Sequence, residues 1–69
     1  MEKFSTRLRE LRLEEGLSQY QLAVASGLSQ TAIAHWELEK RVPNANAVIA
    51  LAKFFDVTTD YILGLTDGF

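Results

Sequence analysis

Few side chains in this chain could carry out covalent or metal chemistry. Its 69 residues include no cysteine and a single histidine, His35. Without cysteine there is neither a thiolate nucleophile nor a disulfide, and one histidine by itself cannot hold zinc. The sequence also lacks a phosphate-binding glycine loop, a nucleophile motif and an acid–base pair with the histidine. We therefore expect no enzymatic activity, no metal and no cofactor.

Residues 30–35 offer a different chemistry, based on hydrogen bonds and methyl contacts. The amide of Gln30 can form two hydrogen bonds with N6 and N7 of adenine, and the methyl groups of Thr31 and Ala32 can meet the methyl group of thymine. The ring nitrogens of His35 can bond a base or a phosphate. These side chains can act together only if one rigid element presents them.

The tetrapeptide Gly-Leu-Ser-Gln occurs twice, at 16–19 and 27–30, and each copy has the features of a helix start. Ser18 and Ser29 are good N-caps, and Gln21 completes a capping box with Ser18. The leucine before each serine can clasp an apolar residue five positions later, as a hydrophobic staple. Each glycine suits the left-handed end of a preceding helix. The two copies therefore predict three consecutive helices, the middle one about two turns long.

Apolar spacing predicts an all-α fold of five helices in one domain, residues 1–69. Phe4, Leu8 and Leu11 form one stripe of a first helix, and no segment alternates like a strand. The hydrophobic fraction of 48% is typical of a folded chain. We expect helices over 4–15, 19–26 and 30–38, a fourth capped by Asn44 with Val48, Leu51, Ala52 and Phe55 on one face, and a short fifth capped by Thr58.

The net charge of −2 is unusual for a nucleic-acid binder, since most such domains are basic. The acidic residues Asp56, Asp60 and Asp67 lie near the C-terminal end, whereas the charges between 16 and 44 cancel. A neutral middle segment can still present a locally positive face. The overall charge therefore does not exclude DNA as a partner.

Two short helices joined by a tight glycine turn make a helix-turn-helix, a geometry that can place its second helix in the DNA major groove. The chain resembles, over nearly its whole length, the helix-turn-helix family of phage Cro and CI repressors and their small bacterial relatives. The motifs that carry the resemblance are Arg-Leu-Arg at 7–9, both copies of Gly-Leu-Ser-Gln, Leu-Ala at 22–23, Ile33, Trp36-Glu37, Pro43 and Asp-Tyr-Ile-Leu-Gly at 60–64. Each is weak alone, but their order and spacing are specific. The resemblance implies a lambda-repressor-like fold that binds double-stranded DNA.

The family pattern assigns roles to particular residues. Side chains near the start of the second helix of the motif, and one turn on, reach base edges. The expected base contacts are Gln30, Thr31, Ala32 and His35. The expected phosphate contacts are Ser18, Gln19, Tyr20, Lys40, Arg41 and Asn44. The resemblance also implies a structural ion pair between Arg12 and Glu37 that ties the first helix to the third.

The sequence departs from the family pattern in ways that bear on affinity. Val24 and Ala25 stand at positions that are usually charged, and Ile49 is more apolar than expected. Because the helix over 30–38 contains no arginine or lysine, we expect modest affinity for a single domain. A homodimer on a palindromic operator would double the contacts.

The expected dimer surface is apolar and C-terminal. It consists of Tyr61, Ile62, Leu63, Leu65 and Phe69, more than so small a core can bury. In the alternative, Leu63 and Leu65 fold back onto the first helix and Phe69 is a frayed end, or the chain continues in the native protein.

Other readings of the chain stay open at this point. The five helices could form a protein-interaction module that no longer binds DNA, an antitoxin, or the N-terminal domain of a longer repressor. A repressor is the default regulator because occluding a promoter requires only binding. No apolar run could span a membrane, and MEKFSTRLRE lacks the apolar stretch of a signal peptide. We therefore expect a cytoplasmic, bacterial or phage-encoded, nucleoid-associated protein.

Overall fold

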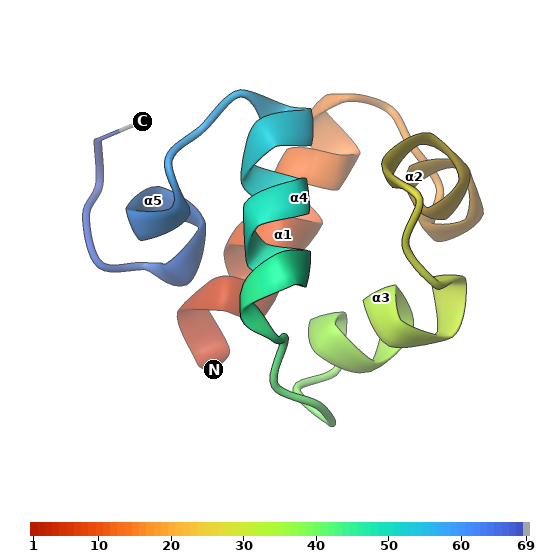
Figure 1. Cartoon of the computed structure of the whole chain (residues 1–69), viewed down its shortest axis with the longest axis horizontal. Coiled ribbons are helices and arrows are strands. Elements are labelled where there is room, and N and C mark those ends of the chain that lie inside the picture. The colour runs from red at the N-terminus through yellow and green to blue at the C-terminus, as the bar shows by residue number, and fades with distance from the viewer. Residues whose placement is uncertain (69) are drawn as a thin grey trace.

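The computed structural model describes residues 1–68, so Phe69 lies outside the described residues. The helices are α1 (Glu2–Glu14), α2 (Gln19–Ser26), α3 (Gln30–Glu37), α4 (Ala45–Phe55) and α5 (Thr59–Leu63). The prediction of five helices and no strand is confirmed for residues 1–68. Figure 1 shows α4 near the middle of the molecule, with α5 on one side and the α2–α3 pair on the other. None of the helices in this part of the chain is long and apolar enough to cross a membrane.

Helix α1 begins at Glu2, two residues before the expected start. The hydroxyl group of Ser5 is buried and lies within hydrogen-bonding distance of the carbonyl oxygens of Met1 and Trp36. The ring of Phe4 packs edge-on against that of Trp36, with 6.2 Å between centroids. Phe4 and Ser5, in the first turns of α1, therefore contact the end of α3, and the apolar spacing of α1 alone does not reveal these contacts.

Both Gly-Leu-Ser-Gln segments start helices, as predicted. The Ser18 hydroxyl accepts a hydrogen bond from the backbone N–H of Gln21, and the Gln21 side chain accepts one from the N–H of Ser18. Ser29 accepts from the N–H of Ala32 and caps α3. Gly27 between them has φ +75°, a left-handed conformation that favours glycine. This glycine makes the short turn between α2 and α3 possible.

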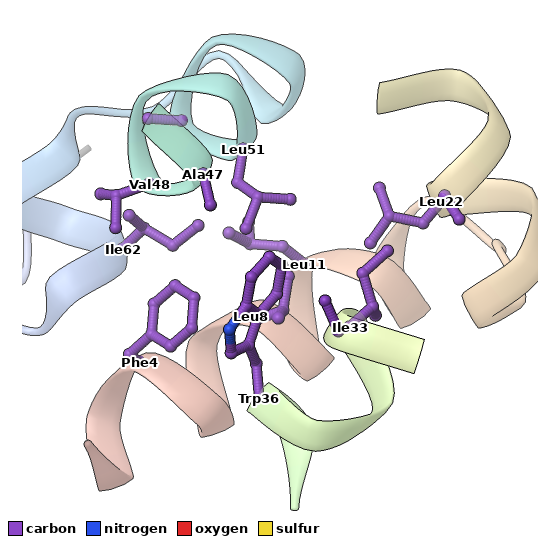
Figure 2. Packing of buried hydrophobic residues seen from close by; sticks show 13 residues of the cluster. Phe4, Leu8, Leu11, Leu22, Ile33, Trp36, Ala47, Val48, Leu51 and Ile62 are labelled. Carbon is purple, nitrogen blue, oxygen red and sulfur yellow. The ribbon is translucent and has the colours of Figure 1, made fainter. Parts of the chain in front are cut away.

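A single core joins all five helices (Figure 2). Its largest fully buried side chains are Phe4, Leu8, Leu22, Ile33, Leu51 and Ile62. Figure 2 shows Leu22 and Ile33 pointing toward each other from α2 and α3, which joins the two helices of the motif. Because Ile62 is fully buried, its expected place in an exposed dimer surface is wrong. Ile62 belongs to the core cluster, and Val57, just before α5, packs against the same cluster.

The segment after α5 is fastened to α1 by Arg7. The guanidinium group donates hydrogen bonds to the carbonyl oxygens of Tyr61 and Thr66 and pairs with Asp67 at 2.7 Å. It also lies over the Tyr61 ring, 4.2 Å from the centroid. Gly64 allows the segment to lie close to α1, since a Cβ atom at this position would clash with the side chain of Lys3. Tyr61 and Leu63 are accordingly half-buried, whereas Leu65 remains exposed.

Candidate nucleic-acid interface

The outward face of α3 begins with two exposed polar side chains. Gln30 and Thr31 occupy the first turn of the helix and are both exposed. The opposite face is buried through Ile33 and Trp36. The helix is therefore fixed on its inner side and leaves its N-terminal polar side chains in solvent, where they could meet a base edge.

Ala32 does not belong to this outward face. Its side chain is only 7% exposed and forms part of the core. It lies four residues before Trp36, so the two side chains share one side of the helix. The expected contact between the Ala32 methyl group and thymine is therefore wrong in this structure.

His35 lies at the border between the outward face and the core. It is half-buried, and its Nδ1 is buried without a hydrogen-bond partner among the described residues. Its Nε2 is the ring nitrogen left to meet a base or phosphate.

The exposed residues around α3 include several further donors. The oxygen atoms of Ser18 and Asn44 accept capping hydrogen bonds at the starts of α2 and α4. This leaves the serine hydroxyl proton and the asparagine N–H groups available to donate. Tyr20 is 63% exposed on α2, and Lys40 and Arg41 are exposed in the loop after α3. These five side chains are able to bind phosphate oxygens.

Arg12 and Glu37 lie behind this face and form a bidentate ion pair. Nε of Arg12 is 2.7 Å from Oε2 of Glu37, and Nη2 is 2.9 Å from Oε1. The side chains are only 11% and 5% exposed, respectively. Hydrogen bonds to Glu37 raise the pKa of Arg12 above its ordinary value, against the opposing effect of burial, and the carboxylate charge raises it further. The pair joins α1 to the end of α3.

Two further hydrogen bonds extend this pair into a network. Nη1 of Arg12 donates to the carbonyl oxygen of Leu17, at 2.8 Å. Nε2 of Gln19 donates to Oε1 of Glu37, at 3.2 Å. The family resemblance implied the ion pair but not the Gln19 bond, because glutamine is a common helix-start residue with many possible partners.

Pairing within this network changes the charge near α3. Glu37 is neutralised by Arg12, so the exposed charged side chains that follow α3 are Glu39, Lys40 and Arg41. Their sum is positive although the whole chain carries −2. This local excess of one positive charge is consistent with a polyanionic partner at this face.

Glu39 holds an unusual backbone conformation next to these cations. Its φ is +61°, in the left-handed region, and its N–H donates to the carbonyl oxygen of Trp36. The N–H of Lys40 donates to the carbonyl oxygen of His35, at 2.8 Å. Together these bonds form a Schellman motif without its usual glycine. The motif directs the chain sharply away from α3 and fixes where Lys40 leaves the helix.

An apolar groove lies where α4 and α5 meet the N-terminus. It is lined by Met1, Val42, Pro43, Ala45, Val48, Ile49, Thr59 and Leu63. Val42 is 71% exposed and Ile49 is 43% exposed. Ile49 was identified in the sequence as unusually apolar, but the groove brings together residues from Met1 to Leu63, 62 positions apart, and could not be predicted from spacing. We call it the α4–α5 groove.

Comparison with known proteins places this geometry in a family. Residues 8–62 match the family described as Helix-turn-helix. The chain is 39% identical over 64 residues to the uncharacterized HTH-type transcriptional regulator YobD of Bacillus subtilis, covering 93% of this chain and 57% of YobD. It is 41% identical over 61 residues to the HTH-type transcriptional activator BcrR of Enterococcus faecalis, covering 88% of this chain and 30% of BcrR. The chain thus spans less than two thirds of either relative.

A solved structure is similar over most of both chains. It is the restriction-modification controller protein C.AhdI from Aeromonas hydrophila, with a TM-score of 0.80 and 36% sequence identity. The match covers 88% of this chain and 92% of that chain. With the family match over residues 8–62, these findings show that the chain belongs to the helix-turn-helix family of DNA-binding transcriptional regulators of the Cro/CI type.

Proposed function

We propose that this protein binds double-stranded DNA sequence-specifically, with α3 in the major groove. The observation that carries the proposal is the division of α3 into a fixed inner face and an exposed polar outer face. Gln30 and Thr31 read base edges in this arrangement, and His35 contributes its Nε2. Lys40 and Arg41 anchor the adjacent phosphates.

The remaining phosphate contacts lie around the helix starts. The N-terminus of α2 carries unpaired backbone N–H groups and the positive end of the helix dipole, which suit a phosphate. Ser18, Tyr20 and Asn44 add their side-chain donors. Because these contacts are neutral, they fix the position of the protein on DNA and contribute little to its salt dependence.

DNA affinity is expected to fall as the salt concentration rises, with a modest slope. Few cationic groups face the DNA, so each subunit should release on the order of two to four counterions. A duplex obtained by selection from random sequences, labelled and titrated at several salt concentrations, measures the slope. A scrambled duplex of the same length is the control. Binding that is the same at low and high salt would contradict the proposal.

We also propose that two copies bind together and act as a repressor by occupying promoter DNA. The α4–α5 groove supports self-association, since it exposes apolar side chains that a second copy could cover. Helix α3 carries no arginine or lysine, so a single copy should bind DNA weakly and a second copy would add contacts. Leu63 lines this groove, whereas Ile62 is buried in the core and is not among the residues that line it. A two-fold contact would place the two α3 helices about one helical turn of DNA, ~34 Å, apart.

Replacing Ile49 with aspartate should convert a dimer into a monomer. The substitution places a charge in the α4–α5 groove, and the side chain is exposed enough for the fold to tolerate it. Sedimentation at micromolar concentration measures the change. Val24→Asp is the matched control, because Val24 is an exposed valine on α2 outside the groove. A wild-type protein that stays monomeric and binds its operator one subunit at a time defeats the homodimer.

A further inference from the structure

The side chain of Gln19 connects the two ends of the helix-turn-helix. Gln19 is the first residue of α2, and Glu37 is the last residue of α3. Nε2 of Gln19 donates to Oε1 of Glu37 at 3.2 Å. The residues are 18 positions apart, so this bond spans the motif from its beginning to its end. Its location distinguishes it from the capping bonds, which join residues three positions apart.

The bond also completes the environment of a buried carboxylate. Glu37 is 5% exposed, and Arg12 donates one hydrogen bond to each of its oxygen atoms. A carboxylate has lone pairs for about four hydrogen bonds, so Oε1 has room for a second donor. Gln19 fills that place. A buried acceptor that loses a donor is destabilised, which gives this bond a definite energetic role.

The same carboxylate therefore fixes three helices at one point. Arg12 comes from α1, Gln19 from α2 and Glu37 from α3. Arg12 also donates to the carbonyl oxygen of Leu17, just before α2. The start of α2 is thus held by two hydrogen bonds, one from Arg12 to Leu17 and one from Gln19 to Glu37. Both lie beside the last residue of α3.

We propose that Gln19 is a positioning residue, whose side chain sets the orientation of α3 relative to α2 and so determines how well α3 discriminates between base sequences. This role rests on the proposed DNA-binding function. It differs from the phosphate contact that the family pattern implies for this position. A phosphate ligand raises affinity for every sequence alike, whereas a positioning residue raises the preference for the correct sequence.

The first experiment needs no DNA and no substitution. Hydrogen exchange of the side-chain amide protons is measured by NMR, with Gln21 as the internal reference. The Gln21 side chain accepts through its oxygen atom and belongs to an exposed residue, so its amide protons face water. One Gln19 amide proton is expected to exchange about tenfold more slowly than those of Gln21. Equal exchange rates at the two glutamines overturn the proposal.

The second experiment measures discrimination in Gln19→Met, which keeps the shape of the side chain and removes its donors. The ratio of affinities for the selected duplex and a scrambled duplex is expected to fall about tenfold, with the affinity for the scrambled duplex and the salt slope unchanged. Gln21→Met, on the same helix, should leave the ratio intact even though it removes a capping bond.

The possible outcomes separate this proposal from the proposed function. If Gln19→Met weakens binding to both duplexes by the same factor, the side chain is a phosphate ligand and the positioning role is overturned. If the wild-type protein binds no duplex, the proposed function fails and the role in discrimination fails with it. Slow exchange of the Gln19 amide would in that case still establish the link between α2 and α3 in the free protein.

Discussion

Replacing Arg12 with alanine is expected to lower the free energy of unfolding by about 3–5 kcal/mol. The substitution leaves Glu37 as a buried carboxylate without its charge partner, because its side chain is only 5% exposed. It also removes the donor to the carbonyl oxygen of Leu17. Urea denaturation followed by the fluorescence of Trp36 measures the change. A loss below about 1 kcal/mol would mean that the pair behaves as an exposed one.

A double substitution to apolar residues provides the control for this result. Arg12→Met with Glu37→Leu removes both charges, so neither is left unpaired, and much of the lost stability should return. If the double variant loses the sum of the two single losses, the residues do not interact. The pKa of Arg12 is raised above its ordinary value, so the guanidinium group stays charged as the pH rises through the range in which a free arginine loses its proton. On the alkaline side, the contribution of this charge to stability is therefore lost only as the pH passes through the raised pKa of Arg12.

Replacing Gln30 with alanine is expected to weaken binding to the preferred site by about 1–3 kcal/mol and to relax the preference at one base pair. The exposed amide at the start of α3 is the side chain best placed for two hydrogen bonds to adenine. Arg41→Ala should instead weaken binding to all sequences about equally, because its guanidinium group meets phosphate. Titrations with a set of single-base variants of the selected duplex measure both effects.

The Gln30→Ala and Arg41→Ala variants also serve as controls for each other. Both residues are exposed, so neither substitution should change the stability of the fold by more than about 0.5 kcal/mol. Any difference in binding then comes from the DNA contacts themselves. The same profile of sequence preference in the two variants would show that the separation between reading and anchoring residues is wrong.

Local signals in the sequence were sufficient to predict the helices and their caps. Ser18, Ser29, Asn44 and Thr58 each accept the capping hydrogen bond that their position in the chain implied. Such bonds join residues three positions apart, so both partners can be identified within one short stretch of sequence. The start of α1 was placed two residues too late, because Glu2 and Lys3 are exposed charged residues and add nothing to the apolar stripe that begins at Phe4.

The site was harder to predict because it depends on contacts between helices. Ala32 was expected to face DNA, yet α3 packs against both α1 and α2, so its buried face is wide enough to include this residue. Ile62 was assigned to an exposed surface, yet it is fully buried in the core that all five helices share. The bond between Gln19 and Glu37 had no signal in the sequence, since it requires the angle between α2 and α3.

The most direct test of DNA recognition by α3 is NMR mapping of the protein bound to its selected duplex. Backbone and side-chain shifts are recorded for the free protein and for the complex. The largest changes are predicted at Gln30, Thr31, His35, Lys40 and Arg41, with the segment that Arg7 holds after α5 little affected. If the changes fall instead on the α4–α5 groove, or if no selected duplex produces any, α3 is not a DNA-reading helix and the central claim is wrong.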